Sequence, residues 1–109
     1  MISRRSANRP SNPLKWETVG GSVIKGEGSL EGALREAKEE VGLDLQPENG
    51  KILFRKVRDV IDGWHFGDIL YVWQFSYDGE CDLQNATTDE VCETKWLYPA
   101  GQYLCRCLH

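Results

Sequence analysis

Three glutamates of this chain recur at a spacing that suits the binding of a metal ion. Glu36, Glu39 and Glu40 stand at positions i, i+3 and i+4, so a helix would place them on one face, where like charges repel. We therefore expect a positive group between them. Mg²⁺ is held by a few carboxylate oxygens together with phosphate oxygens of a substrate. The spacing favours a magnesium site, and a solvated, charge-rich surface helix is the alternative.

The segment around these glutamates carries the signals of a helix. Ser29 can cap the N-terminus, Glu31 favours the positive end of the helix dipole, and Gly42 suits a left-handed residue after the last turn. Arg35 lies four residues from both Glu31 and Glu39, so it can pair with either and orient Glu39. An apolar stripe at helical spacing must pack on another layer, which we expect to be a sheet. The stripe consists of Leu30, Ala33, Leu34, Ala37 and Val41.

A glycine-rich turn before this helix adds a further carboxylate, Glu27, and a backbone that can approach a ligand closely. A Walker-type phosphate loop requires Lys and then Ser or Thr directly after its last glycine, whereas Glu27 and Gly28 follow Gly26 here. The intervals between Gly26, Gly28 and Gly32 also differ from those of a dinucleotide-binding fingerprint. Both alternatives are excluded, and the metal site is favoured.

Taken together, the segment from Gly21 to Leu43 resembles the Nudix box. The matching positions are Gly21, Glu27, Arg35, Glu36, Glu39, Glu40, Val41, Gly42 and Leu43. Ala37 stands where the family usually has a larger aliphatic residue, which affects packing behind the helix, and Val19 stands where a proline is common. Because the pattern is long and its positions are fixed, the resemblance is far more specific than a short motif.

The resemblance implies a hydrolase that cleaves the pyrophosphate bond of a nucleoside diphosphate linked to another moiety, with Mg²⁺ or Mn²⁺ as cofactor. A small-molecule nucleoside diphosphate derivative would be the substrate. The metal ligands it implies are Glu36, Glu39 and Glu40, with Glu27 as an additional or water-mediated ligand and the carbonyl of Gly20 as a further oxygen donor. The catalytic residues it implies are Glu39, Glu36 and the supporting Arg35.

The general base stays open between two places in the chain. Within the box, Glu39 or Glu36 could remove a proton from water. Some members of the family take the base from a later loop instead. The residues of this chain that match that loop are Asp89, Glu90 and Glu93, for which a solvated turn is the favoured interpretation.

Candidate substrate-binding residues lie outside the box. The resemblance favours Arg5 as a phosphate contact, since the family often has a basic residue there. Trp64 and Phe66 lie in a glycine-bounded loop and could stack on a base or a sugar. The alternative, which we favour for these two aromatics, is a hairpin whose side chains cover the edge of the core.

For the fold we expect an α/β (α+β) architecture, a Nudix-like α/β/α sandwich with a mixed β-sheet, in one domain that comprises residues 1–109. Strands are expected near residues 16–24, 51–60, 69–77 and 91–98, with the third in the centre of the sheet. The family usually has further strands before the segment that matches Ile2–Arg5 and a helix after the final strand. We therefore expect a fold truncated at both ends, which a second copy could complete as a homodimer.

Composition narrows the class of protein. A net charge of −4 argues weakly against a nucleic-acid-binding surface, and no apolar run is long enough to span a membrane. The start of the chain lacks a signal-peptide pattern, so we expect a cytoplasmic protein. The four cysteines have no zinc-binding spacing and are expected to be free thiols.

Two alternatives to the hydrolase remain. A catalytically silent Nudix-derived module could bind a nucleotide or a protein, although such a module has no need to keep like charges together. Isoprenoid diphosphate isomerisation on the same fold would require a cysteine just before the box, where this chain has Val19-Gly20-Gly21-Ser22. We favour the hydrolase over both.

Overall fold

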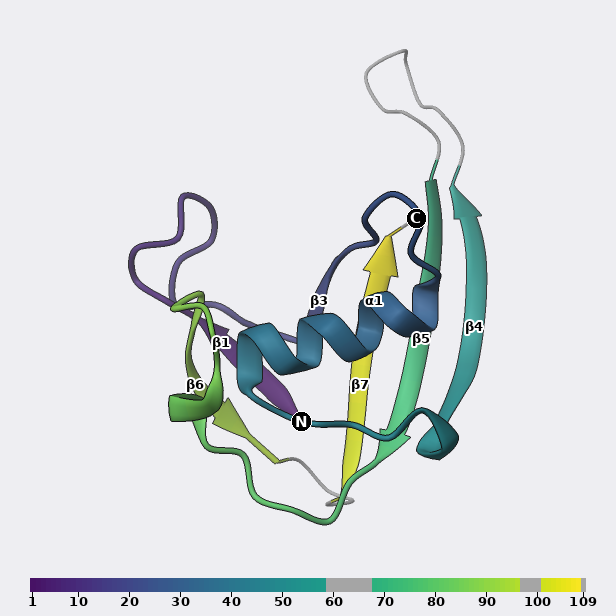
Figure 1. The fold of residues 1–109 in the computed structure, drawn as a ribbon. Coiled ribbons are helices and arrows are strands. Elements are labelled where there is room, and N and C mark those ends of the chain that lie inside the picture. The colour runs from purple at the N-terminus through teal and green to yellow at the C-terminus, as the bar shows by residue number, and fades with distance from the viewer. Residues whose placement is uncertain (59–67, 97–100, 109) are drawn as a thin grey trace.

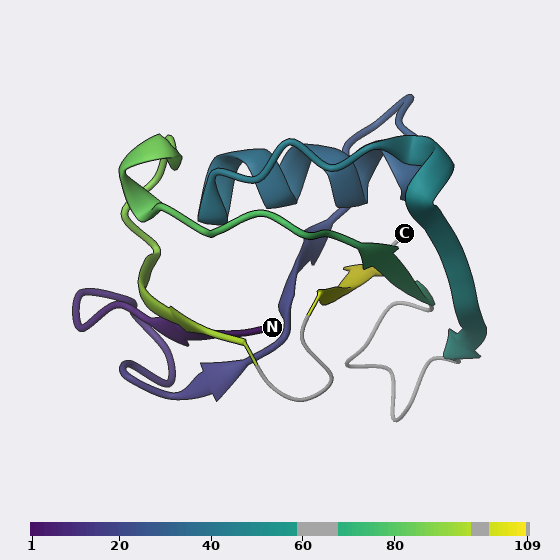
Figure 2. The same cartoon turned by 90° about the horizontal axis from the view of Figure 1, so that it is seen from below.

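One long helix lies across two β-sheets in the computed structural model, which describes residues 1–58, 68–96 and 101–108 (Figure 1). The helix begins as α1 (Ser29–Glu36) and continues as a π-helical turn, η1 (Ala37–Val41). Figure 2 shows it as a layer on one side of the strands. The short 3₁₀ turns are η2 (Pro47–Asn49) and η3 (Leu83–Asn85). The strands are β1 (Ile2–Arg5), β2 (Trp16–Glu17), β3 (Val19–Ser22), β4 (Gly50–Arg58), β5 (Asp68–Ser76), β6 (Val91–Lys95) and β7 (Gln102–Leu108).

The strands form a three-stranded sheet of order β2-β1-β6 and a four-stranded sheet of order β3-β7-β5-β4. The larger sheet is mixed, because β3 runs parallel to β7 and the other neighbours are antiparallel. Strand β5 lies between β4 and β7, so the prediction of a central strand there is confirmed. The mixed helix and sheet content confirms the predicted α/β class.

The last strand of the sheet was missed by the sequence patterns. We expected the final strand at residues 91–98, but β6 ends at Lys95 and a further strand, β7, follows it. The tail was correctly predicted not to be a helix. In β7, Tyr103 and Cys105 are fully buried, and they alternate with the outward-facing Arg106 as a half-buried strand requires. The cysteines and the arginine in this short segment hid the alternation of buried and exposed residues that would have indicated a strand.

The core lies between the helix and the larger sheet. Ala33, Ala37 and Val41 of the predicted stripe are completely buried, and Leu30 and Leu34 pack against them. Small side chains at this interface let the helix approach the sheet closely, where the rings of Phe75 and Tyr103 fill the space with centroids 6.3 Å apart. The departure from the family pattern at Ala37 is therefore accommodated by bulk on the opposing strands.

The helix ends differ in part from the expected caps. Gly28, and not Ser29, is the N-cap residue, and its backbone N–H donates to Glu31 at 2.7 Å. The Ser29 hydroxyl instead accepts a hydrogen bond from the indole N–H of Trp73 at 3.1 Å. At the other end Gly42 has φ +72°, as predicted, and an added Cβ would lie 2.7 Å from the backbone of Asn85. Only glycine fits both that conformation and that contact.

No helix in the described ranges is long and apolar enough to cross a bilayer. The expected homodimer and the cytoplasmic location stay predictions.

Candidate functional site

Arg35 lies at the centre of the acidic face of the helix. Its Nε is 2.9 Å from Glu27 Oε2, and its Nη1 is 2.9 Å from Glu36 Oε1 and 3.2 Å from Glu39 Oε2. Its Nη2 donates to the carbonyl of Ser22 at 2.9 Å. The positive group expected among the carboxylates is thus supplied by the chain itself. Of the two predicted partners of Arg35 the structure selects Glu39.

These ion pairs shift the pKa values of Glu27 and of Arg35. Hydrogen bonding to Arg35 lowers the pKa of Glu27 below its usual range. The same contact, followed by the attraction of Glu36, raises the pKa of Arg35. The side chains of Glu27 and Glu36 are only 12% and 11% exposed, so neither carboxylate is well solvated without the guanidinium. Arg35 therefore supports the acidic face, as the sequence predicted.

Gly21 makes room for Glu36. A Cβ added at Gly21 would lie 2.3 Å from Glu36 Oε1 and 2.5 Å from its carboxyl carbon. The carboxylate of Glu36 is therefore folded against the backbone of β3, and the residue as a whole is only 9% exposed. The first glycine of the box has a steric reason to be glycine, since any side chain would displace a predicted metal ligand.

The π-helical turn determines how the last two glutamates lie. Widening of the helix over Ala37–Val41 moves Glu39 and Glu40 away from the positions that a regular helix would give them. Burial, followed by the effect of the nearby carboxyl groups of Glu90 and Glu36, raises the pKa of Glu40 to about 9. Carboxylates in contact repel unless a proton or a cation lies between them.

The later loop reaches the helix through its backbone. The amides of Thr87 and Thr88 donate to the carbonyl of Glu39 at 2.9 and 3.2 Å, a carbonyl left available at the end of the widened turn. This docking brings Glu90 to Glu40. Of the other two loop candidates, Asp89 accepts from Asn8 and Glu93 pairs with Arg4. Glu90 is therefore the loop carboxylate that joins the box.

The carboxylates are the right donors for Mg²⁺, but they are not gathered into a ready cage. Within the described part of the chain, no three or more His, Cys, Asp or Glu side chains are arranged to hold a metal ion. The ion pairs of Arg35 explain this, because they draw Glu27, Glu36 and Glu39 toward the guanidinium. The donor set fits a hard divalent cation, and binding requires these carboxylates to exchange Arg35 for the ion.

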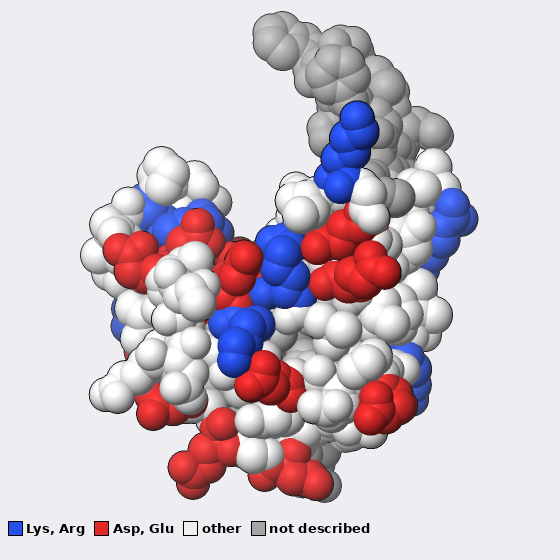
Figure 3. Space-filling model, viewed as in Figure 1, with Lys and Arg blue, Asp and Glu red and all other residues white. Residues whose placement is uncertain are grey.

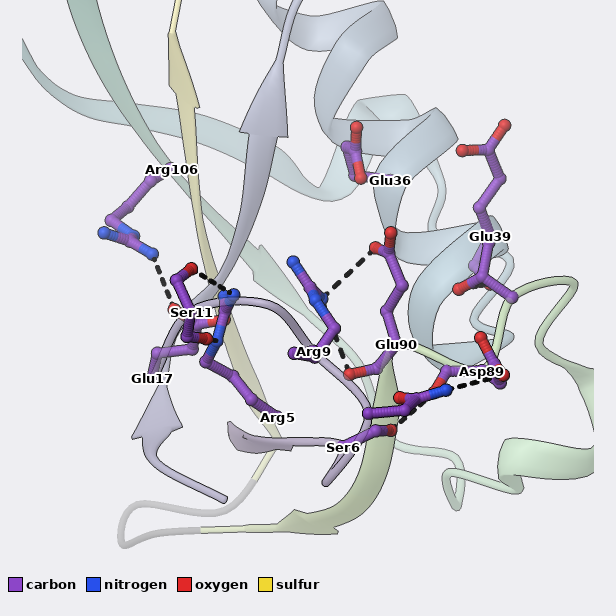
Figure 4. A network of polar contacts seen from close by, with 12 residues as sticks. Arg5, Ser6, Arg9, Ser11, Glu17, Glu36, Glu39, Asp89, Glu90 and Arg106 are labelled. Carbon is purple, nitrogen blue, oxygen red and sulfur yellow. Dashed lines mark hydrogen bonds and ion pairs between the residues drawn. The ribbon is translucent and has the colours of Figure 1, made fainter. Parts of the chain in front are cut away.

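A pocket of about 230 Å³ opens beside Glu40. Figure 3 shows this face hollowed between the loop after β1 and the larger sheet, with acidic and basic side chains interspersed. Figure 4 shows the arginines reaching in from the side opposite Glu36 and Glu39. The residues that line the pocket are Arg5, Arg9, Glu17, Gly20, Gly21, Ser22, Glu40, Leu70 and Arg106.

The predicted substrate contacts have different outcomes. Arg5 lines the pocket, but it is held by Glu17 at 3.0 Å and by the carbonyl and hydroxyl of Ser11. Trp64 and Phe66 lie outside the described residues. Gly20 lines the pocket, and its role as an oxygen donor stays a prediction.

Two further arginines line the pocket. Arg9 follows β1 in a loop and bonds to Glu90 through both the carbonyl and the carboxylate. In the sequence it belongs to a basic group near the start of the chain, for which phosphate contact and a flexible basic turn are equally favoured; the group consists of Arg4, Arg5, Arg9 and Lys15. Arg106 comes from β7, where it is the register partner of Gly20. No local motif marks it, because its position depends on the pairing of two distant strands.

We expect Arg35→Gln to destabilise the protein in the presence of EDTA. The variant leaves the poorly solvated Glu27 and Glu36 without their cationic partner, which should cost about 2 kcal/mol and lower Tm by roughly 10 °C. Millimolar Mg²⁺ should recover part of this loss if a cation can replace the guanidinium. Thermal unfolding with EDTA and with Mg²⁺ measures both effects, with Arg55→Gln as a charge-matched control on β4. A Tm equal to that of the wild type in EDTA would contradict the central place given to Arg35.

Comparisons with known proteins agree with the box. The model of the NUDIX domain matches residues 1–101. An uncharacterised Nudix hydrolase of Yersinia pestis is 33% identical over 102 residues, which are 91% of this chain and 50% of that protein. An uncharacterised Nudix hydrolase of Listeria innocua is 27% identical over 99 residues, 89% of this chain and 54% of that protein.

The chain thus spans about half the length of the curated relatives it matches. No solved structure is significantly similar to it. The family model covers nearly the whole chain, including β1, the box helix and the loop that carries Glu90. The chain belongs to the Nudix family.

Proposed function

We propose that this chain is a divalent-cation-dependent pyrophosphohydrolase that acts on a nucleoside diphosphate linked to another moiety. One observation carries the proposal: Glu40, whose pKa is raised by burial and by the nearby carboxyl groups of Glu90 and Glu36, lines a pocket together with Arg5, Arg9 and Arg106. A diphosphate needs cationic partners for its oxygens and a carboxylate site for the ion that accompanies it. Both chemistries meet at this wall of the pocket.

The residues that would hold Mg²⁺ or Mn²⁺ are those of the box. Glu36, Glu39 and Glu40 supply carboxylate oxygens, Glu27 supplies a further or water-mediated contact, and Gly20, which lines the pocket, is the candidate carbonyl donor. The ion, when bound, supplies neutralisation of the diphosphate charge and a lowered pKa for the attacking water.

Glu39 is the residue of the box best placed to accept the proton of that water. Its side chain is 41% exposed and has a single, longer contact with Arg35 at 3.2 Å, whereas Glu36 is buried against β3. The water oxygen forms a bond to one phosphorus, the bridging oxygen leaves with the other phosphoryl group, and Glu39 takes up the proton. Glu90, from the docked loop, is the second candidate for this role.

Two of the pocket arginines, Arg5 and Arg9, provide charge that a diphosphate needs for binding. Both line one cavity with Gly20 and Gly21. Guanidinium groups bind phosphoryl oxygens with two parallel hydrogen bonds, which fixes orientation as well as charge. Arg5 is already held in place by Glu17 and Ser11. Its remaining N–H groups can therefore bind a phosphate without a further loss of side-chain freedom.

The direct test is a substrate panel that contains ADP-ribose, dinucleoside polyphosphates, nucleotide sugars and nucleoside triphosphates. Each is incubated with Mg²⁺, Mn²⁺ or EDTA, and released nucleoside monophosphate and phosphate are measured. We expect release from at least one class with either metal and none in EDTA. Silence across the panel from a folded sample would contradict the enzyme. It would favour the alternative of a binding module, for which the absence of a preformed ligand cage among the described residues is the supporting observation.

A further inference from the structure

One carboxylate in the pocket holds two arginines. Glu17 Oε1 is 3.0 Å from Arg5 Nη1, and Glu17 Oε2 is 3.4 Å from Arg106 Nη2 (Figure 4). Two guanidinium groups against one carboxylate leave a net positive charge at this wall. Glu17, Arg5 and Arg106 all line the cavity, so that charge faces a space large enough for an anionic group. The box needs none of these residues, and the cation site does not explain why they converge.

The two arginines are held with different strength. Three hydrogen bonds tie Arg5 to Glu17 and to the carbonyl and hydroxyl of Ser11, at 3.0 to 3.2 Å. Arg5 is thus an anchor for the loop that follows β1.

Arg106 is the more available of the two. Its side chain is 49% exposed, and its contacts with Glu17 and with the carbonyl of Thr18 are both 3.4 Å long. Such long contacts are weak and can be exchanged for ligand oxygens at little cost. The backbone beneath it is fixed, because Arg106 pairs with Gly20 in the parallel register of β3 and β7. The strand therefore positions a side chain that remains able to take a ligand.

The order of charges along the pocket gives this arginine a separate task. In Figure 4, Glu39 lies on one side, Arg9, Glu36 and Glu90 lie in the middle, and Arg106 lies with Glu17 on the opposite side. A diphosphate at the carboxylates would meet Arg9 first, since Arg9 pairs with Glu90 at 3.4 Å and lines the same pocket as Glu40. In this view Arg106 lies on the far side of Arg9 from Glu39, so a diphosphate held by the carboxylates and Arg9 leaves Arg106 for a further anionic group.

We propose that Arg106 binds an anionic group of the substrate beyond the diphosphate that is cleaved, so that the preferred substrate carries an additional phosphoryl group. This rests on the proposed hydrolase function. The additional group is either the third phosphate of a nucleoside triphosphate or a phosphate ester elsewhere on the substrate, and both present the same dianionic oxygens to a guanidinium.

The first test measures binding and does not depend on turnover. Inorganic tripolyphosphate and pyrophosphate are titrated in EDTA into the wild type, Arg106→Gln, Arg106→Lys and Arg4→Gln. Arg4 is the matched control, because it forms a 3.5 Å ion pair with Glu93 and does not line the pocket. We expect Arg106→Gln to weaken tripolyphosphate binding tenfold to a hundredfold, as for a lost charged hydrogen bond. Arg106→Lys should lose less, and Arg4→Gln should bind as the wild type does.

The second test distinguishes the two sources of the group. The ratio of kcat/KM is compared for ATP against ADP-glucose and for NADPH against NADH, in the wild type and in Arg106→Gln. A tenfold fall of the first ratio assigns a third phosphate, and a tenfold fall of the second assigns a phosphate ester. Unchanged ratios in an active enzyme would overturn the inference and leave the hydrolase standing.

The hydrolase can also fail while the anion site at Arg106 is supported, and the anion site can fail by itself. If no substrate is hydrolysed but Arg106→Gln still loses tripolyphosphate, the hydrolase fails and the anion site is supported. If Arg106→Gln binds tripolyphosphate as tightly as the wild type, or if Arg4→Gln loses as much, the anion site is overturned. Circular dichroism of each variant establishes that a loss of binding comes from a folded protein.

Discussion

Glu36→Gln is expected to lower metal-dependent turnover at least a thousandfold. Glu36 contacts Glu40 and Arg35 and is folded against Gly21, so its carboxylate is the most firmly positioned oxygen donor of the box. Glutamine keeps the shape of the side chain but removes its charge, and a thousandfold loss corresponds to about 4 kcal/mol of transition-state stabilisation. Initial rates on the best substrate of the panel, at saturating Mg²⁺, provide the measurement.

The control for this variant is Glu48→Gln. Glu48 lies in η2 with an exposed side chain, so its replacement changes the net charge equally without touching the acidic face. We expect Glu48→Gln to turn over at the wild-type rate. If Glu36→Gln retained more than a tenth of the wild-type rate, Glu36 would not be a ligand of a catalytic ion.

Gly21→Ala is expected to reduce turnover about a hundredfold while the protein remains folded. The added methyl group would lie 2.3 Å from Glu36 Oε1, so the carboxylate must move by about 1 Å to restore van der Waals contact. A displacement of that size at a catalytic group costs on the order of a hundredfold in rate. Metal-dependent kcat/KM and a thermal unfolding curve separate the loss of geometry from a loss of stability.

Gly28→Ala serves as the matched substitution for this experiment. An added Cβ at Gly28 would have its nearest contact at 3.7 Å, and the backbone φ of −83° is accessible to alanine. Because glycine is preferred over alanine at a helix N-cap, this change should cost about 1 kcal/mol of stability, and it should leave turnover intact. Equal activity in Gly21→Ala and Gly28→Ala would refute the steric role of Gly21.

The sequence predicted the box helix and its environment well, because those features depend on local spacing. The buried stripe, Glu31 in the first turn and the left-handed Gly42 follow from helical periodicity and glycine stereochemistry, and the structure confirms each of them. The partner of Arg35 was predicted only as one of two choices. Spacing along a helix offers both neighbours, and the competing bond from Gly28 N–H to Glu31 decides between them.

The assembly around Glu40 could not be predicted from local patterns. The π-helical turn changes which glutamates meet, and no residue type in Ala37–Val41 signals it. The carbonyl of Glu39 in this turn accepts hydrogen bonds from Thr87 and Thr88, which lie nearly fifty residues further along the chain. These hydrogen bonds bring Glu90 to the site. Such placement depends on tertiary contacts, which periodicity does not contain.

The pocket arginines Arg5 and Arg106 show the same limit of prediction from local sequence patterns. Arg5 was found through the family resemblance, and the structure adds that it anchors a loop through Ser11 and Glu17. Arg106 was missed because β7 itself was missed, and a side chain on an unrecognised strand cannot be assigned to a face. The parallel pairing of β3 with β7 is what carries Arg106 to the pocket.

The central claim is that the carboxylates around Glu40 bind a divalent cation, and Mn²⁺ titration followed by electron paramagnetic resonance tests it most directly. Free Mn²⁺ is counted in the wild type, Glu36→Gln and Glu48→Gln at equal protein concentration. We predict that the wild type and Glu48→Gln bind Mn²⁺ with the same affinity and that Glu36→Gln binds at least tenfold more weakly. Equal binding by all three proteins, or none by the wild type, would contradict the assignment of the site.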